Sequence, residues 1–390
     1  MDFQLSPEQQ TLQRTVRTFC AREILPHASR WSRDRIFPRD VISSLASLGM
    51  LGIQIPEQFG GAGLGLVDLC VAVEEIAAAD ASVGLTVASH NLLCMDHIYL
   101  AGSNDQRSRF LPRLASGEDL GAWCLTEPDA GSDAGSARTR AERREGPQGV
   151  EWVLRGAKNF ITQGSVAGVY VILASTTPAR KQRGLTAFIV RAGTPGLSVG
   201  RHVEKMGLAA SDTADLAFDE VVVPDSDRLG DLDRGFQDTG KVLDRGRVGI
   251  AAWAIGIGRA AYEASLTYAK DRVQFGQPIA NFPAIRLMLA EMVTELSAAR
   301  LLMWRAAVAQ DNGQKTTRES SIAKLYSSKA ALKACDIAVQ IHGGYGYTKE
   351  FPVERYLRDV KLATIGEGTS EIQKLVIARE VLNAARHLAQ

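Results

Sequence analysis

The sequence predicts an α+β protein of several domains, in the order helices, β domain, helical bundle. Three observations predict this order: helical periodicity up to about residue 118, β-branched runs between Gly121 and Leu229, and long amphipathic repeats from Gly235 onward. The 390 residues are 45% hydrophobic and 23% charged, which is typical of a soluble globular protein with two or three domains. We find no internal repeat.

Three helices are expected in the N-terminal region. Residues 6–9 (Ser-Pro-Glu-Gln) form a capping-box start with Pro at the first helical position. Further helices are predicted over residues 38–48 and 66–79. Between them, the glycine-rich residues 59–63 predict a flexible turn.

The β region contains four β-branched runs bounded by Gly, Pro, Asp or charged loops. They cover residues 150–154, 169–174, 185–190 and 214–223. A turn-rich loop at 125–133 leaves an earlier, first strand. The segment Arg138 to Gln148 is rich in Arg, Glu and Gly and predicts a solvated hairpin tip whose charges need no functional role.

Long antiparallel helices are predicted after residue 235, because apolar residues recur there at intervals of three and four. The two repeating sets are Ile285, Leu289, Met292, Leu296, Ala299 and Met303, and Ile322, Leu325, Leu332, Cys335 and Val339. Residues 256–261 match the GxGxxA dinucleotide fingerprint. That fingerprint requires a preceding strand, whereas residues 248–255 continue a helix, so we expect close helix packing by small residues.

Composition excludes several classes of function. The net charge of +1 provides no bulk field for nucleic acid or an anionic membrane, and no apolar run approaches the roughly 20 residues of a membrane span. Five scattered cysteines predict buried reduced thiols rather than disulfides or a zinc site. Six dispersed histidines predict no metal centre. No signal peptide is recognisable, which favours a cytoplasmic location.

The most informative segment is residues 365–373, Ile-Gly-Glu-Gly-Thr-Ser-Glu-Ile-Gln. It places Glu367 between two glycines and just before a helix that Thr369 is expected to cap, with Glu371 in the first turn. The glycines allow backbone and ligand to approach the carboxylate, and the helix N-terminus favours an anionic or electron-rich guest. The alternative is an ordinary loop acid before an amphipathic helix.

Four further segments carry candidate binding residues. Residues 123–133 offer the hydroxyls of Thr126 and Ser132 and free backbone N–H groups, or form a plain surface turn. Within residues 159–164, Phe160 and Thr162 would share one strand face and could stack on and hydrogen-bond a planar ligand, unless Phe160 is a core residue. Arg272 is suited to bind a pyrophosphate, and the alternative is an ordinary cap at the C-terminal end of a helix.

The fourth segment is residues 340–347, Gln-Ile-His-Gly-Gly-Tyr-Gly-Tyr, a glycine-rich exit from a bundle helix. A helix C-cap accounts for one glycine. Three glycines within four positions also favour close approach of a ligand.

Taken in chain order, the motifs LTEPDAGSD, FITQG, DRGR, RVQFGQP, QIHGGYGY and IGEGTSEIQ resemble the acyl-CoA dehydrogenase family across essentially the entire chain. The resemblance implies a helical N-terminal domain (residues 1–119), a middle β-barrel domain (120–230) and a C-terminal four-helix bundle (231–390). It also implies FAD as cofactor and a homotetramer built as a dimer of dimers. Glu367 matches the catalytic base that removes the α-proton of an acyl-CoA thioester, while FAD takes the β-hydride and a trans-2-enoyl-CoA forms.

The resemblance also assigns binding residues. Implied FAD contacts are Trp123, Leu125, Thr126, Ser132, Phe160, Thr162, Thr369 and Glu371 in one subunit and, toward a neighbouring subunit's FAD, Arg272, Gln274, Phe275, Gln340, Gly343 and Gly344. Implied substrate contacts are Ser132, Asp244, Arg247, Gly366 and Gly368. No FAD contact is expected at Pro283, where the family commonly has Gln.

Several positions depart from the family pattern. Gly366 replaces the usual Tyr before the base, which predicts a wider pocket and favours a branched or cyclic acyl group. Phe160 replaces a Trp. Some members carry their base on a bundle helix, but the matching position here is Gly246, so Glu367 is the candidate. Residues 87–91 contain no Arg, which disfavours a dicarboxylyl substrate, and His90 is expected to be a packing or pocket-wall residue.

The expected function is dehydrogenation of a short to medium or branched acyl-CoA, with electrons passed to electron-transferring flavoprotein. The alternatives are an O2-using relative, such as an acyl-CoA oxidase, and a non-catalytic CoA-binding homologue. A colourless purified protein that takes up no FAD would favour the last.

Overall fold

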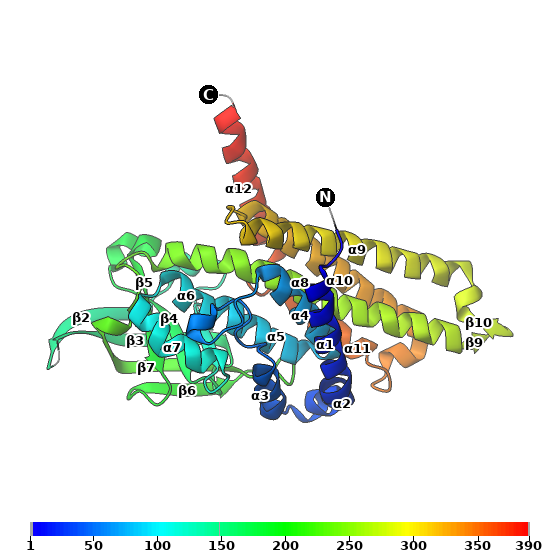
Figure 1. Ribbon diagram of the computed structural model, residues 1–390, viewed down its shortest axis with the longest axis horizontal. Helices are drawn as coiled ribbons and strands as arrows, with labels where there is room; N and C mark the ends of the chain where they lie inside the picture. The colour runs from blue at the N-terminus through cyan, green and yellow to red at the C-terminus, as the bar shows by residue number, and fades with distance from the viewer. Residues whose placement is uncertain (1–2, 148, 389–390) are drawn as a thin grey trace.

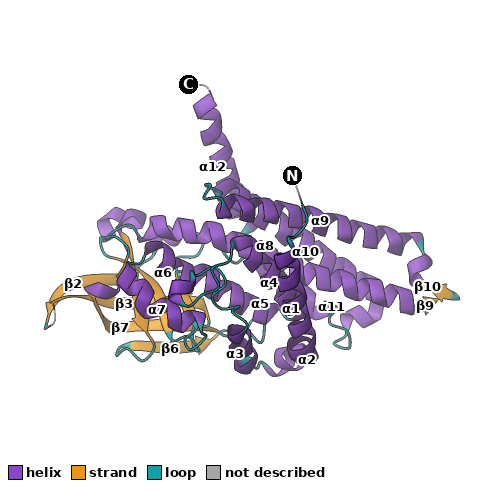
Figure 2. Ribbon diagram, in the orientation of Figure 1, coloured by secondary structure: helices purple, strands orange, loops and turns teal. Residues whose placement is uncertain are grey.

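The computed structural model describes residues 3–147 and 149–388, in which helices precede and follow a β domain (Figure 1). The predicted order of helical, β and helical regions is confirmed (Figure 2). In the described part of the chain, no helix combines the length and the apolar character that crossing a membrane requires.

The N-terminal region begins with α1 (Pro7–Phe19), whose capping box is formed by Ser6 and Gln9 as predicted. The predicted helices over residues 38–48 and 66–79 correspond to α3 (Arg39–Ser47) and α4 (Leu66–Ala79). Two segments were not predicted: a π-helical turn (Cys20–Ile24) and α2 (Leu25–Asp34), which continue α1.

Three more helices complete the N-terminal region, and a π-helical segment connects the first two of them. They are α5 (Ala81–Ser89), α6 (Asp96–Ala101) and α7 (Asn104–Ala115). A second π-helical segment, His90–Met95, joins α5 to α6 and is largely buried. Such π-helical insertions often occur at functional sites.

The β domain contains one eight-stranded sheet. Its strands are β1 (Gly121–Cys124), β2 (Arg140–Gly146), β3 (Gly149–Thr162), β4 (Val169–Ser175), β5 (Leu185–Arg191), β6 (Leu197–His202), β7 (Thr213–Pro224) and β8 (Arg228–Leu229). The hydrogen-bonded order is β6-β7-β3-β2-β4-β5-β8, and β1 pairs with β4 in parallel. The four predicted runs lie in β3, β4, β5 and β7.

One expectation about this domain is wrong. Residues 138–148 were predicted to be a hairpin tip, but most of them form β2, which pairs antiparallel with β3 from Arg140↔Arg155 to Gly146↔Gly149. Within β2 the side chain of Ala141 is buried while the charged side chains are exposed, so these charges lie on a paired strand rather than on a turn. Gln148, the end of that segment, lies outside the described residues.

The sheet curls around a core of its own. The rings of Trp152 on β3 and Phe188 on β5 lie 5.5 Å apart between centroids, although two strands separate β3 from β5 in the sheet order. Their buried neighbours include Ile172, Leu216 and Val221 from β4 and β7. This internal packing is characteristic of a barrel-like sheet.

The C-terminal bundle is formed by α8 (Gly235–Asp271), α9 (Pro283–Asp311), α10 (Thr317–His342) and α12 (Ser370–Leu388). A short hairpin of β9 (Val273–Gln274) and β10 (Gln277–Pro278) connects α8 to α9, and α11 (Val353–Val360) follows α10. Residues 256–261 lie inside α8, which confirms helix packing in place of a dinucleotide fold. A Cβ on Gly256 would lie 2.4 Å from the Glu74 carbonyl oxygen.

The packing face of α10 differs from the prediction. Most of the large apolar residues expected there are only half-buried, whereas the buried face consists mainly of small and polar side chains. These are Ser320, Ser321, Ala323, Lys324, Ser327, Ser328, Ala330, Ala331, Ala334, Cys335 and Ala338. Small side chains allow α10 to approach α8 closely, and a Cβ on Gly258 of α8 would lie 3.1 Å from the Ala331 Cα.

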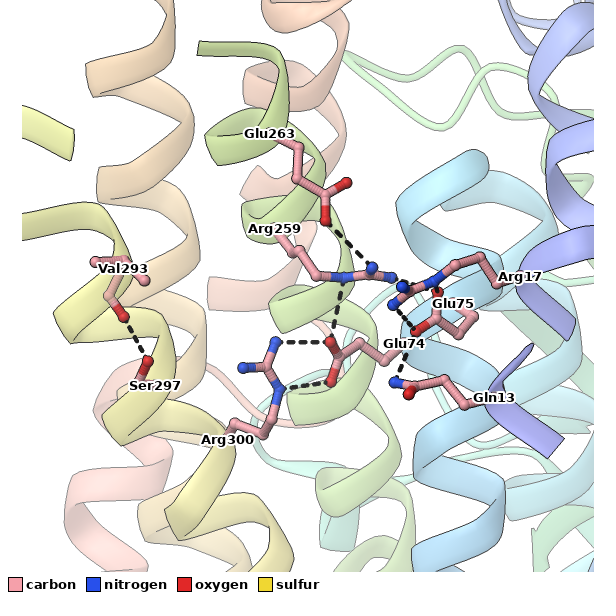
Figure 3. Close-up of polar contacts among 9 residues, drawn as sticks. All are labelled: Gln13, Arg17, Glu74, Glu75, Arg259, Glu263, Val293, Ser297 and Arg300. Atoms are coloured by element: carbon pink, nitrogen blue, oxygen red, sulfur yellow. Dashed lines mark hydrogen bonds and ion pairs between the residues drawn. The ribbon is translucent and has the colours of Figure 1, made fainter. Parts of the chain in front are cut away.

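Helices α1, α4, α8 and α9 are joined by a network of buried ion pairs (Figure 3). Arg259 lies between two glutamates of α4, with its guanidinium 3.3 Å from Glu74 and 2.7 Å from Glu75. Arg300 of α9 completes the pairing of Glu74 at 2.7 Å, and Arg17 of α1 that of Glu75 at 2.8 Å. Each buried carboxylate therefore has two cationic partners.

Candidate functional site

Glu367 lies in a tight turn between the end of a short 3-10 helix (Lys361–Thr364) and α12. Its φ is +53° and that of Gly368 is +93°, so two consecutive residues adopt left-handed conformations. The conformation costs about 1–3 kcal/mol for a residue other than glycine, and such strain is concentrated at functional sites. The Thr369 hydroxyl accepts a hydrogen bond from the Ile372 amide at 3.3 Å, which confirms the predicted N-cap.

Two buried side chains hold the carbonyl groups of this turn. Lys324 of α10 donates from Nζ to the Gly368 carbonyl oxygen at 2.6 Å. Gln373 of α12 donates from Nε2 to the carbonyl oxygens of Gly368 and Glu367, at 2.9 and 3.2 Å. Both donors have exposed fractions of 0%. The strained turn is thus fixed from two helices.

The carboxylate of Glu367 points at a gap between small residues of α8. A Cβ on Gly246 would lie 2.3 Å from Glu367 Oε2 and 3.1 Å from Leu93 Cδ2. One turn further, a Cβ on Gly249 would lie 2.1 Å from Leu92 Cδ1. The glycines of α8 and the π-helical segment therefore leave the space that the carboxylate occupies, and Leu93, half-buried, forms an apolar wall beside it.

The environment makes Glu367 an unusually weak acid. Burial raises the pKa of its carboxyl group to about 7, against the opposing effect of the nearby cations Lys324 and Arg247. Among the described residues its Oε2 is buried and has no hydrogen-bond partner. A carboxylate with a pKa near neutrality and an unpaired buried oxygen is suited to take a proton.

Arg247 approaches the same site from α8. Its guanidinium is 7% exposed and donates to Asp244 Oδ1 at 2.8 Å, and Thr317 donates to the other carboxylate oxygen at 2.6 Å. Burial lowers the pKa of Arg247 and raises that of Asp244. The Nε of Arg247 is buried without a hydrogen-bond partner in the described structure, and could donate to a ligand oxygen.

The predicted binding segments of the β domain lie side by side. The Asn159 amide donates to the Thr126 carbonyl oxygen at 2.9 Å, and Lys158 Nζ donates to that of Leu125 at 3.1 Å. The fully buried Lys158 also pairs with Glu127 at 2.7 Å. This pair fixes the loop to β3, so the hydroxyl of Thr126 and the ring of Phe160 belong to one rigid unit.

Phe160 does not sit on a regular strand. Lys158 pairs with Leu216 and Ile161 with Ala214, so Asn159 and Phe160 together oppose one residue of β7. The bulge gives Phe160 a φ of +58° and leaves its ring 59% exposed. The core-residue alternative is therefore wrong, and so is the simple two-residue alternation with Thr162.

The other predicted residues of this domain differ in accessibility. Trp123 is half-buried and donates from its indole nitrogen to His97 Nδ1 at 2.9 Å. Thr126 and Thr162 are half-buried, and Ser132 is exposed.

A separate cluster lies at the β9–β10 end of the molecule, opposite the β domain (Figure 1). Arg272 caps the end of α8 as predicted, and its guanidinium lies over the Tyr345 ring, 5.6 Å from the centroid. Phe275 is 93% exposed with a φ of +53°. The other exposed residues of this cluster are Gln274, Gln340, Gly343 and Gly344.

The two groups of predicted cofactor residues therefore do not meet within one chain. Gly366 and Gly368, by contrast, lie beside Glu367, as do Thr369 and Glu371 at the start of α12.

His90 has a packing environment. It is fully buried, the Gly121 amide donates to its Nδ1 at 3.0 Å, and its Nε2 lies 3.1 Å from the Leu114 carbonyl oxygen. Burial lowers the pKa of the imidazole to about 4. The expectation of a packing residue is confirmed.

Three residues of the site were not predicted: Leu93, Lys324 and Gln373. Leu93 carried no recognisable sequence signal. A lysine on the inner face of a predicted amphipathic helix is a detectable signal, because lysine is almost never fully buried without a partner. Gln373, four residues after the predicted cap Thr369, lies one turn into the helix and would face the same loop.

Comparison with known proteins adds an independent line of evidence. Residues 6–118, 122–221 and 233–382 match the N-terminal, middle and C-terminal domains of acyl-CoA dehydrogenase. The chain is similar to the acryloyl-CoA reductase (NADH) of Anaerotignum propionicum, with 44% identity over 98% of this chain and 96% of that protein.

Two solved structures are closely similar. Butyryl-CoA dehydrogenase from Megasphaera elsdenii has 38% identity and a TM-score of 0.95 over 98% of this chain and all of that one. A chain in a structure described as the electron transferring flavoprotein of Acidaminococcus fermentans has 37% identity and a TM-score of 0.96, also over 98% of this chain and all of that one.

Proposed function

Because the chain belongs to the acyl-CoA dehydrogenase family, a family of FAD-dependent oxidoreductases, we propose that it removes hydrogen from the α and β carbons of an acyl-CoA thioester with Glu367 as base. The observation that carries the proposal is the buried, unpaired Oε2 of Glu367 on a carboxyl group whose pKa is about 7. The product is a trans-2-enoyl-CoA.

The base acts on a weakly acidic C–H group. The α-proton moves to Glu367, and the developing negative charge on the thioester oxygen requires hydrogen-bond donors. The backbone N–H of Glu367 lies in the strained turn and is our candidate donor. Each preorganised donor of this kind contributes about 3 kcal/mol to the stabilisation of the transition state.

The residues of the β domain fit a flavin. A planar ring system could stack on the exposed ring of Phe160, while the Thr126 and Thr162 hydroxyls and loop N–H groups supply hydrogen-bond donors. These residues would hold FAD, which when bound would supply an acceptor for the hydride from the β-carbon. Trp123, Leu125 and Ser132 complete the proposed flavin-binding surface. Asp244 and Arg247 are the proposed residues for the CoA portion of the substrate.

The acyl group is proposed to be short to medium or branched. The three atoms nearest to a Cβ at Gly366 all belong to Leu362, the closest at 3.5 Å, and we propose that the acyl group uses the space that the missing side chain leaves. No arginine lies in residues 87–91 to pair with a second carboxylate. The similarity to a butyryl-CoA dehydrogenase also supports a short chain.

We propose electron-transferring flavoprotein as the electron acceptor. Its support is the similarity to a chain in a structure of such a flavoprotein. We further propose a homotetramer in which Arg272, Gln274 and Phe275 reach the FAD of a neighbouring subunit. The wide separation of the two clusters in one chain supports this arrangement (Figure 1).

Anaerobic titration of the yellow protein with a panel of acyl-CoA thioesters tests the reaction. We expect loss of flavin absorbance with linear C4–C8 or branched thioesters and a much weaker response to glutaryl-CoA. Glu367→Gln should bind the same ligands yet lose at least 1000-fold in the rate of flavin reduction. Reduction of this variant at the parental rate would refute the assignment of the base.

A reductive direction is the second candidate, since a relative of 44% identity is named as an NADH-dependent acryloyl-CoA reductase. The reaction would be the reverse, with Glu367 returning the proton to the α-carbon. NADH oxidation on addition of acryloyl-CoA, with and without electron-transferring flavoprotein, distinguishes the two directions. Rapid O2 consumption by the reduced protein would instead favour an oxidase.

A further inference from the structure

The buried lysine of α10 has no role in the reaction described above. Its side chain is 0% exposed, and its Nζ donates to the Gly368 carbonyl oxygen at 2.6 Å. Within the described part of the chain, this ammonium group contacts a carbonyl and no carboxylate. A buried cation without a paired anion is costly, so such groups are usually retained for a purpose.

Of the carboxyl groups that act electrostatically on Lys324, Glu367 has the largest effect. The second cation near Glu367, Arg247, already pairs with Asp244 at 2.8 Å, so much of its charge is compensated. Lys324 has no such partner. Its electrostatic effect on Glu367 is accordingly larger than that of Arg247.

We propose that Lys324 is a positioning residue for the base: it fixes the turn that presents Glu367 and supplies the positive charge that keeps the buried carboxyl group ionisable near neutral pH. This inference rests on the proposed function of Glu367. The hydrogen bond to Gly368 holds the residue after the base in its left-handed conformation. The charge lowers the free energy of the ionised carboxylate in a site where water is excluded.

The charged groups around the site come from every element that packs there. They are Lys324 of α10, Asp244 and Arg247 of α8, Glu367 of the turn, and Glu371 and Arg379 of α12. Burial lowers the pKa of Lys324 to about 8, opposed by Glu367. Lys324 is therefore cationic over the range in which Glu367 titrates, around pH 7. As the pH falls below 7, Glu367 takes up a proton and the base is lost.

The test is the pH dependence of flavin reduction by the best acyl-CoA substrate in Lys324→Met. Loss of the cation should shift the acidic limb of the pH–rate profile to higher pH by one unit or more. The rate at pH 7 should then fall about 5-fold or more, with partial recovery at pH 9. Lys324→Arg, which keeps the charge, should retain the parental limb.

Ser328→Ala is the matched control. Ser328 is buried one turn further along α10 and donates to the Ala363 carbonyl oxygen at 2.8 Å, so its removal breaks a neutral hydrogen bond between the same helix and the same loop. It should leave the acidic limb in place. An unchanged limb in Lys324→Met, whatever its loss of rate, would overturn the proposal, as would an equal shift in Ser328→Ala.

A second measurement avoids turnover. Carbon-13 NMR of protein labelled at the δ-carbon of glutamate follows the titration of Glu367, with Glu367→Gln identifying its signal. The pKa of Glu367 should rise in Lys324→Met and in a second neutral variant, Lys324→Gln. If one of the two variants fails to fold, the other still tests the proposal. If no acyl-CoA reduces the parent flavin, the proposed function fails; if the parent is reduced but neither variant shifts the titration, only the role of Lys324 fails.

Discussion

The carboxyl group proposed as base should lower the stability of the folded protein at high pH. The pKa of Glu367 is about 7 in the folded chain, against an ordinary value of 4.5, so between these values the folded state binds more protons than the unfolded state. Stability therefore falls as the pH rises through this window. A shift of this size corresponds to about 3 kcal/mol.

Glu367→Gln should remove this loss of stability at high pH. We expect the variant to be about 3 kcal/mol more stable than the parent at pH 8 and nearly equal to it at pH 4.5. Urea denaturation at the two pH values measures the difference. Equal stabilities at pH 8 would show that the carboxyl group ionises without a significant desolvation penalty.

Gly246 provides a second prediction at the same carboxylate. Its Cβ would lie 2.3 Å from Glu367 Oε2, so Gly246→Ala should displace the carboxylate and reduce kcat about 10- to 100-fold. Stability should not fall comparably, because alanine is favoured over glycine in a helix by up to about 1 kcal/mol. Gly240→Ala on the same helix, where a Cβ meets nothing within 4 Å, should leave kcat unchanged. Full activity of Gly246→Ala would contradict the described geometry.

Gly366 tests the shape of the acyl pocket. Gly366→Tyr should add a ring where the structure leaves room, and we expect kcat/KM to fall more for branched than for linear thioesters. The comparison of isobutyryl-CoA with butyryl-CoA in parent and variant measures this selectivity. Equal losses for both substrates would remove the proposed link between this glycine and acyl specificity.

Among the helices, the ion-pair network between α1, α4, α8 and α9 should be a major determinant of stability. Glu75 is 3% exposed and pairs with both Arg17 and Arg259. Glu75→Ala would remove the ion-pair partner of Arg17 and the nearest of the three carboxylates that pair with Arg259, and should cost about 3 kcal/mol in the free energy of unfolding. Glu263→Gln is the control, because its exposed carboxylate pairs with the same Arg259 at 3.3 Å and should change stability by less than about 1 kcal/mol. Similar losses in both variants would contradict the dominance of the buried pairs.

Local sequence patterns predicted some elements well and others poorly. The predicted bounds of α4, residues 66–79, agree with the structure, and the start of α1 followed from its capping box. The buried face of α10 was missed because close approach to α8 selects small residues, while the large apolar side chains pack at its margins. The bulge at Phe160 depends on pairing with β7, over 50 residues away, which no local pattern contains.

The candidate site shows the same limit. Glu367, its flanking glycines and the cap at Thr369 are contiguous, so the sequence alone predicted the turn, whereas the role of base comes from the family resemblance and stays a prediction. Gly246 and Lys324 reach the carboxylate only through the packing of α8 and α10. Family resemblance supplied Gly246 as a position, but its contact with Glu367 and the contact of Lys324 with the turn are visible only in three dimensions.

Exposed apolar side chains gather along α12. This helix begins against α10 in the bundle, and its C-terminal part extends away from the other helices, with Leu375 and Leu382 exposed by 66% and 63% (Figure 1). A cavity of about 950 Å³ lies between α9, the start of α10 and α12, and is lined by Leu301, Trp304 and Val308. These features favour an oligomer over an isolated chain.

The exposed ring of Phe275 gives this arrangement its sharpest test. The ring is 93% exposed and makes only an edge contact with Phe282, at 6.0 Å between centroids, so Phe275→Ala should leave the stability of the single chain unchanged. If the ring covers the FAD of a neighbouring subunit, the variant should retain less than half of the parental flavin after gel filtration, with greater loss on dilution. Flavin content and light-scattering mass measure both effects. Leu48→Ala, which removes another exposed apolar side chain, should retain the full flavin content, and the same full retention by Phe275→Ala would refute a cofactor shared between subunits at this hairpin.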